Sequence, residues 1–178
     1  MKFAYADPPY LGYASFYAEL HPEAMSWDDP ETHRALISRL CADYPDGWAL
    51  SLTSGNLKDI LPMCPTDVRV GAWVKPFCSF KKHVPPAYAW EPVIFRGGRK
   101  HDVENETVRD WIPANITLQK GLTGAKPREF CLWIFALMKA QRGDQFDDIF
   151  PGTEILGEAW KEYAREPIEQ LGMFANVV

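Results

Sequence analysis

The sequence predicts a single α/β domain built on a doubly wound, mostly parallel sheet. The chain has 178 residues, of which 47% are hydrophobic, and this is enough apolar material for one compact core. Short apolar runs, typical of buried strands, alternate along the chain with longer segments of helical periodicity. The sequence shows no repeat, low-complexity tract or linker. We therefore expect residues 1–178 to form one domain.

The N-terminal half is expected to contain three strands and two helices. The strands are KFAYA (2–6), GWALSLT (47–53) and VRVGAWV (68–74), because each is a short apolar run. DDPETHRALISRLCADY (28–44) predicts a helix with Asp29 as its cap and Pro30 in its first turn. SGNLKDILPMC (54–64) predicts a short helix that stops near Pro62. Residues 11–29 predict a long loop, and loops of that length are usually functional or disordered.

The C-terminal half continues the alternation. EPVIF (91–95) and QFDDIF (145–150) predict two more strands. Between them, KPREFCLWIFALMKAQRGD (126–144) predicts a helix with Pro127 at its start and Gly143 just past its end. PGTEILGEAWKEYAREP (151–167) predicts a turn and a closing helix. Residues 97–125 are polar and show no clear period, so no element is assigned to them.

Composition limits the environment of the protein. No apolar run approaches the roughly 20 residues that cross a bilayer, and the N-terminus lacks the long apolar centre of a signal peptide. We therefore expect a cytoplasmic protein with no membrane partner. The four cysteines are scattered, and neither they nor the four histidines show metal-ligand spacing. We expect reduced thiols and no metal.

The net charge of −5 is unevenly distributed. Between Trp73 and His101 there are six positive residues and one acid, Glu91. A basic face on an acidic body can attract a polyanion, but such a stretch can equally be a solvated loop. The candidate nucleic-acid-binding residues are Lys75, Lys81, Lys82, Arg96, Arg99 and Lys100.

Two stretches come directly after expected strands. In a doubly wound sheet, ligands bind outside the carboxyl ends of the strands. Asp7-Pro8-Pro9-Tyr10 follows the first strand, and Asp148-Ile149-Phe150-Pro151-Gly152 precedes the last helix. The second stretch is a strand, glycine turn and helix, in which glycine lets the backbone approach a ligand.

These stretches resemble motifs of a known family. DPPY (7–10) resembles the catalytic motif of the S-adenosylmethionine-dependent DNA amino-methyltransferases, the adenine-N6 and cytosine-N4 family. KPREFCLWIFALMKAQRGDQFDDIFPG (126–152) looks like the paired cofactor motifs of that family. WVKPF with YAWEPVIF resembles the strand pair between them, including a glutamate at Glu91. The order of the motifs is similar to the permuted β-type arrangement.

The resemblance implies a fold and a set of roles. The fold would be of the Rossmann-like methyltransferase type. The catalytic residues would be Asp7, Pro8, Pro9 and Tyr10. The Asp7 carboxylate and the Pro8 carbonyl would accept the two N–H groups of the target amine, the prolines would fix that geometry, and Tyr10 would stack on the base. The residues that would bind S-adenosylmethionine are Asp148, Phe150 and Gly152, with Lys126 and Pro127 near its methionine end.

The chain departs from the family pattern in three respects. Glu154 stands where the family usually has a second glycine. The sheet is expected to be trimmed at its C-terminal end, without the strand whose acid holds the cofactor ribose. Residues 97–125 leave room only for a small target-recognition insertion. These departures suggest a homodimer or a partner subunit.

The leading hypothesis is an adenine-N6 methyltransferase acting on DNA, because aspartate at the head of the motif favours adenine. An RNA adenine-N6 methyltransferase and a non-catalytic nucleic-acid-binding subunit with a degenerate cofactor site are the alternatives. The target sequence, and a free nucleoside as substrate, stay open.

Overall fold

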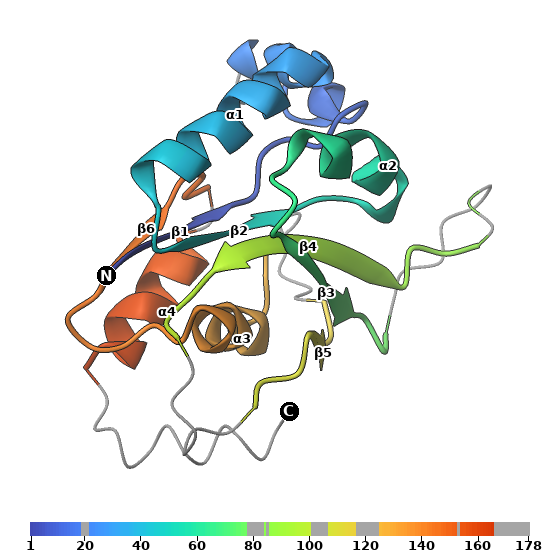
Figure 1. Cartoon of the computed structure of the whole chain (residues 1–178). Coiled ribbons are helices and arrows are strands. Elements are labelled where there is room, and N and C mark those ends of the chain that lie inside the picture. The colour runs from blue at the N-terminus through green and yellow to red at the C-terminus, as the bar shows by residue number, and fades with distance from the viewer. Residues whose placement is uncertain are drawn as a thin grey trace.

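A six-stranded sheet runs through the computed structural model of the chain, with helices on both faces (Figure 1). The structure describes residues 1–18, 22–77, 84, 86–100, 107–116, 125–152 and 154–165. The strands are β1 (Lys2–Ala6), β2 (Gly47–Ser51), β3 (Arg69–Val74), β4 (Trp90–Gly97), β5 (Trp111–Pro113) and β6 (Gln145–Asp148). Their order across the sheet is β5-β3-β4-β2-β1-β6.

The strand directions confirm a mostly parallel sheet. β1 pairs in parallel with both β2 and β6, and β3 pairs in parallel with β5. β4 runs antiparallel to both of its neighbours, β2 and β3. Helices α1 (Pro30–Asp43) and α2 (Leu57–Ile60) cover one face, while α3 (Arg128–Met138) and α4 (Ile155–Tyr163) cover the other (Figure 1). The fold is therefore a doubly wound α/β sheet.

Apolar side chains of β1 pack into the cores on both faces of the sheet. Phe3 and Tyr5 belong to the core under α3 and α4, and Ala4 and Ala6 belong to the core under α1. Successive side chains of a strand point to opposite faces, so a strand with helices on both sides is apolar throughout. This is why KFAYA is a continuous apolar run.

Helix α1 begins as its sequence predicts. The Asp29 side chain accepts a hydrogen bond from the Glu31 backbone N–H at 3.0 Å, and Pro30 occupies the first turn. Leu36, Ile37 and Leu40 are buried at helical spacing. A cap of this kind stabilises a helix by about 1 kcal/mol.

Helix α3 is shorter than predicted. It ends at Met138, and Lys139 adopts the left-handed conformation with φ 48° while its N–H bonds to the Ala136 and Phe135 carbonyls. Gly143 does not terminate the helix but lies in the turn before β6, with φ 91°. The prediction placed the helix end at the nearest glycine, whereas the chain uses a lysine in the conformation that glycine normally supplies.

Two other segments contain more regular structure than predicted. The expected loop at 11–29 contains 3-10 turns at Ala14–Phe16 and Pro22–Asp28. Strand β5 lies inside the unassigned region 97–125 and pairs with β3 at one edge of the sheet. Its three residues, Trp-Ile-Pro, are too few to show a period. Most of the rest of the predicted insertion, at 101–106 and 117–124, lies outside the described residues.

Over the described ranges, no helix is long and apolar enough to cross a membrane. The same ranges contain no group of three or more histidine, cysteine or acidic residues that could hold a metal ion. Cys41, Cys64 and Cys131 are free thiols, and Cys78 is outside the described residues.

Candidate functional site

A cavity of about 550 Å³ opens at the carboxyl ends of β1 and β6. This volume is within the usual range for small-molecule sites. The cavity brings together eight of the nine residues that the motifs nominate for catalysis and cofactor binding, namely Asp7, Pro8, Pro9, Tyr10, Lys126, Asp148, Phe150 and Gly152. Pro127, the ninth, is the residue that precedes the first turn of α3.

The sheet topology explains why the two motifs meet. β1 and β6 are parallel neighbours, and Tyr5 is in register with Asp148. The Ile149 N–H donates to the Tyr5 carbonyl at 2.9 Å, which continues the pairing just past the end of β6. Asp7 and Asp148 therefore emerge at the same edge of the sheet, although the sequence separates them widely.

Charged groups form a connected network around Asp7. The Lys126 ammonium lies 3.0 Å from Asp7 Oδ2 and 3.1 Å from Glu91 Oε2. The Lys75 ammonium pairs with the other oxygen of Glu91. The Tyr10 hydroxyl lies 3.0 Å from Asp7 Oδ1 and 3.3 Å from Glu91 Oε2, so it has two carboxylates to which it can donate. Two ammonium groups thus balance two carboxylates.

Burial and neighbouring charge shift the pKa values of these groups in different directions. Burial raises the pKa of Asp7, and Lys126 only partly offsets this effect. Burial by itself would lower the pKa of Lys126, but Asp7 and Glu91 raise it well above its ordinary value. Burial would also raise the pKa of Glu91, but Lys126 and Lys75 hold it below its ordinary value. Lys126 and Glu91 are therefore charged at neutral pH.

The opposite wall of the cavity is the turn after β6. Burial raises the pKa of Asp148 to about 6, and its carboxylate accepts the Phe150 N–H at 3.2 Å. The Phe150 ring packs edge-on against Trp27, with ring centroids 5.1 Å apart. A Cβ placed on Gly152 would meet nothing within 4 Å, so this glycine leaves the cavity open.

Glu154, which stands where the resemblance would place a second glycine, adopts a backbone conformation that suits glycine. It has φ 55°, the left-handed region that glycine enters without cost, and it directly precedes α4. Its side chain is exposed. The turn therefore has a backbone conformation that suits glycine, and Glu154 adopts it with some strain.

The segment between β1 and α1 supplies cavity residues that sequence reasoning did not name. Tyr17, Glu23 and Ala24 line the cavity. The Asp28 carboxylate holds this segment by accepting the Gly12 N–H at 2.8 Å and the Ala14 N–H at 3.3 Å. The unusual length of the loop indicated either function or disorder, but it could not indicate which side chains line a cavity.

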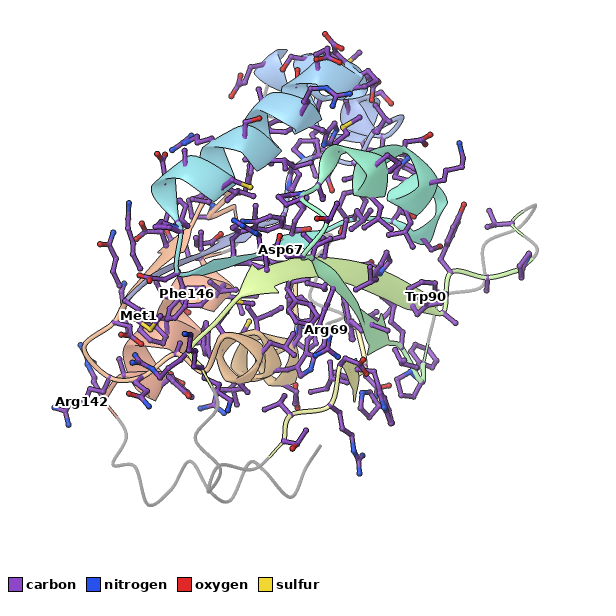
Figure 2. All side chains as sticks on the ribbon, viewed as in Figure 1. Met1, Asp67, Arg69, Trp90, Arg142 and Phe146 are labelled. Atoms are coloured by element: carbon purple, nitrogen blue, oxygen red, sulfur yellow. The ribbon has the colours of Figure 1, made fainter. Side chains whose placement is uncertain are left out.

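A second cavity of about 250 Å³ lies on the other side of Tyr10. Tyr10 and Glu91 line both cavities, whereas Asp7 lines only the first. Tyr88 and Trp90 contribute aromatic rings to the second cavity, and both are exposed. Figure 2 shows Trp90 at the end of the sheet opposite to Met1 and Arg142. These rings offer a surface on which a planar group can stack.

The predicted basic stretch does not form one surface in the described residues. Lys75 points into the network around Glu91, beside the second cavity. Arg96 lies near the far end of β4 and pairs with Asp67 at 2.8 Å, and Arg99 pairs with Asp144 at 2.7 Å. Lys100 follows Arg99 and is exposed, while Lys81 and Lys82 lie outside the described residues. A role in binding nucleic acid stays a prediction for all six.

The strand order and the cavity at the carboxyl edge define a Rossmann-like α/β fold of the methyltransferase type. Over 98% of its length, the chain is similar to the structure of M1.HpyAVI in complex with SAM, with a TM-score of 0.57, 15% identity and 86% of that chain covered. It is similar over the same share to a second structure of M1.HpyAVI, with a TM-score of 0.50, 15% identity and 85% of that chain covered.

A presumed DNA modification methylase from Thermus thermophilus also matches 98% of the chain, with a TM-score of 0.50, 17% identity and 84% of that chain covered. The sequence matches no protein-family model and no curated protein. At these identities, the structural likeness establishes the fold.

Proposed function

We propose that the protein transfers a methyl group from S-adenosylmethionine to the exocyclic N6 of adenine in DNA. The observation that carries the proposal is that Asp7-Pro8-Pro9-Tyr10 and Asp148–Gly152 line one cavity. Two of the similar structures are of one protein, one of them in complex with SAM, and a third is named as a presumed DNA modification methylase. These likenesses support this choice of cofactor and substrate.

The residues at the β6 turn fit the proposed cofactor. S-adenosylmethionine supplies a methyl group that is already activated on a cationic sulfur. The Asp148 carboxylate is an anionic partner for a cationic ligand, and the Phe150 ring offers apolar contact. Gly152 leaves the space that a bulkier residue would fill.

The residues at the β1 end fit the amine. The lone pair of an exocyclic amine is delocalised into the base, so the nitrogen is a poor nucleophile. The Asp7 carboxylate and the Pro8 carbonyl accept its two N–H bonds and direct the lone pair toward the methyl group. As the N–C bond forms and the S–C bond breaks, the nitrogen gives one N–H proton to the Asp7 carboxylate. The prolines fix the backbone, so little reorganisation is needed.

The second cavity fits the ring of the base. It shares Tyr10 with the first cavity, so a base stacked there has its amine close to Asp7. Tyr88 and Trp90 add aromatic surface. A base that is bound in this cavity must be flipped out of its double helix or come from a single strand.

Transfer of a labelled methyl group to DNA, RNA and adenosine, each offered separately, tests the proposal. We expect label in DNA. Label in RNA alone would assign the same chemistry to another substrate. A protein that binds the cofactor but labels none of the three would contradict the proposed activity and favour the non-catalytic binding subunit.

A further inference from the structure

We infer that Glu91 is a positioning residue for methyl transfer. It anchors Lys126 beside Asp7, and it accepts the Tyr10 hydrogen bond when the substrate amine is hydrogen-bonded to the Asp7 carboxylate. This inference rests on the proposed function, because it concerns the approach of an amine to Asp7. It adds a role for a residue on β4, a strand that neither the catalytic nor the cofactor motif includes.

Both oxygens of Asp7 are engaged before any substrate arrives. Oδ2 is held by Lys126 at 3.0 Å, and Oδ1 is within 3.0 Å of the Tyr10 hydroxyl. A phenol has a single proton to donate, so Tyr10 can serve Asp7 or Glu91 but not both. When the amine N–H donates to Asp7 Oδ1, the Tyr10 hydroxyl can donate instead to Glu91 Oε2, which is 3.3 Å away.

Without Glu91, the exchange would leave the partly buried Tyr10 hydroxyl without an acceptor among these groups. An unpaired buried donor is costly, whereas moving a hydrogen bond from one carboxylate to another costs little. Glu91 is fixed for this role, because Lys75 holds its Oε1 and Lys126 approaches its Oε2 at 3.1 Å. Its position in β4, opposite Trp73 of β3, sets its backbone.

The charge of Glu91 also acts on Asp7 directly. Burial raises the pKa of Asp7, and Glu91 raises it further, while Lys126 opposes both effects. Removing the charge of Glu91 therefore lowers the pKa of Asp7 and leaves Lys126 paired with Asp7 alone. The groups that interact with Asp7 from the surrounding elements are Tyr5, Tyr10, Tyr17, Glu91, Lys126 and Asp148. With Lys126 no longer shared, Asp7 becomes a weaker acceptor for the amine.

Glu91→Gln tests the inference, because it keeps the shape of the side chain and removes its charge. The Asp7 pKa can be measured by NMR on protein labelled with ¹³C at aspartate carboxyls, without cofactor or substrate. We expect a lower Asp7 pKa and a kcat reduced by roughly tenfold or more. The cofactor KM should stay unchanged, and the acid limb of the plot of kcat against pH should move to lower pH. Asp110→Asn is the control, because it removes a carboxylate that pairs with Arg69 outside the cavities. It should change neither the Asp7 pKa nor kcat.

The combination of Tyr10→Phe with Glu91→Leu tests the hydrogen-bond exchange, because leucine, unlike glutamine, has no atom that can accept the Tyr10 hydrogen bond. If Glu91 acts through the Tyr10 hydroxyl, the double variant loses less activity than the product of the two single losses. Multiplicative losses, or an unchanged Asp7 pKa in Glu91→Gln, would overturn the inference.

If Glu91→Gln does not fold, Tyr10→Phe alone tests the inference. It keeps the ring and removes the hydroxyl, and we expect a raised Asp7 pKa and a kcat lowered by roughly tenfold. Wild-type values for both would overturn the inference. A wild-type protein that methylates nothing would refute the proposed function instead, and the NMR titration would still report on the coupling of Glu91 to Asp7.

Discussion

The Lys126 ammonium lies 3.0 Å from the Asp7 carboxylate and at the same time binds Glu91 at 3.1 Å. The Lys-Pro motif was expected to lie near the methionine end of the cofactor. The structure keeps Lys126 in the cavity but joins it to the predicted catalytic acid. The lysine is therefore a counter-charge for Asp7 as well as a candidate for contact with the cofactor.

Lys126→Met should destabilise the fold. Its side chain is 10% exposed, and its loss leaves the Asp7 carboxylate without its only ammonium partner among the described residues. Removing one partner of a buried pair costs about 3 kcal/mol of unfolding free energy. Urea unfolding measures the change. Lys58→Met is the control, because Lys58 is 80% exposed and its pair with Asp59 should contribute less than about 1 kcal/mol. Equal losses in the two variants would contradict the role given to Lys126.

Cofactor affinity should rise with pH through the titration of Asp148. Its pKa of about 6 is above the ordinary value, so the carboxylate gains its charge as the pH passes 6. A cationic ligand prefers the charged form, so we expect affinity to increase by roughly tenfold between about pH 5 and pH 7. Calorimetric titration over this range measures it. Asp148→Asn should give a flat profile, and an unchanged slope in that variant would assign the effect to another group.

Gly152→Val should weaken cofactor binding without weakening the fold. A Cβ at this position meets nothing within 4 Å, so the added side chain enters the cavity and not the core. We expect at least a tenfold loss in affinity, which is about 1.4 kcal/mol, and little change in melting temperature. Gly55→Val is the matched control, because Gly55 also has open space around it but lies outside the cavity. Normal affinity in Gly152→Val would place the cofactor elsewhere.

Trp90→Ala should weaken nucleic-acid binding through loss of stacking. The effect of removing one aromatic ring from a base-stacking surface is about 1–3 kcal/mol. Fluorescence anisotropy with labelled single-stranded oligonucleotides measures it. Trp111 is 41% exposed, close to the 39% of Trp90, but lies on β5 outside the second cavity, so Trp111→Ala should bind normally. If both variants bind as the wild type does, the second cavity does not hold a base.

Local patterns predicted the elements on which the site depends. The apolar runs of β1, β2 and β4 and the Asp29-Pro30 start of α1 are signals within a few residues, and each lies where the sequence indicates. The two motifs met at one cavity because parallel neighbouring strands end at the same edge, a consequence of topology that the alternation of strands and helices already implies.

Other features depend on contacts that are distant in sequence. Lys75 was grouped with the arginines of the basic stretch, but its partner is Glu91, across the β3–β4 pair. Composition cannot show which acid a lysine meets. Lys139 and Glu154 adopt left-handed conformations that their residue types disfavour, so neither could be identified as a turn residue from sequence. Glu154→Gly would place glycine at a position whose backbone already suits it.

Methyl transfer to adenine is best measured by mass spectrometry of nucleosides from DNA incubated with the protein and S-adenosylmethionine carrying a deuterated methyl group. We expect deuterated N6-methyladenine with the wild-type protein. We expect at least a hundredfold slower formation with Asp7→Ala, because an acceptor that acts fully only in the transition state is lost. Formation of the product at the wild-type rate by Asp7→Ala, or a label found on another atom of the DNA, would refute adenine-N6 methylation through Asp7.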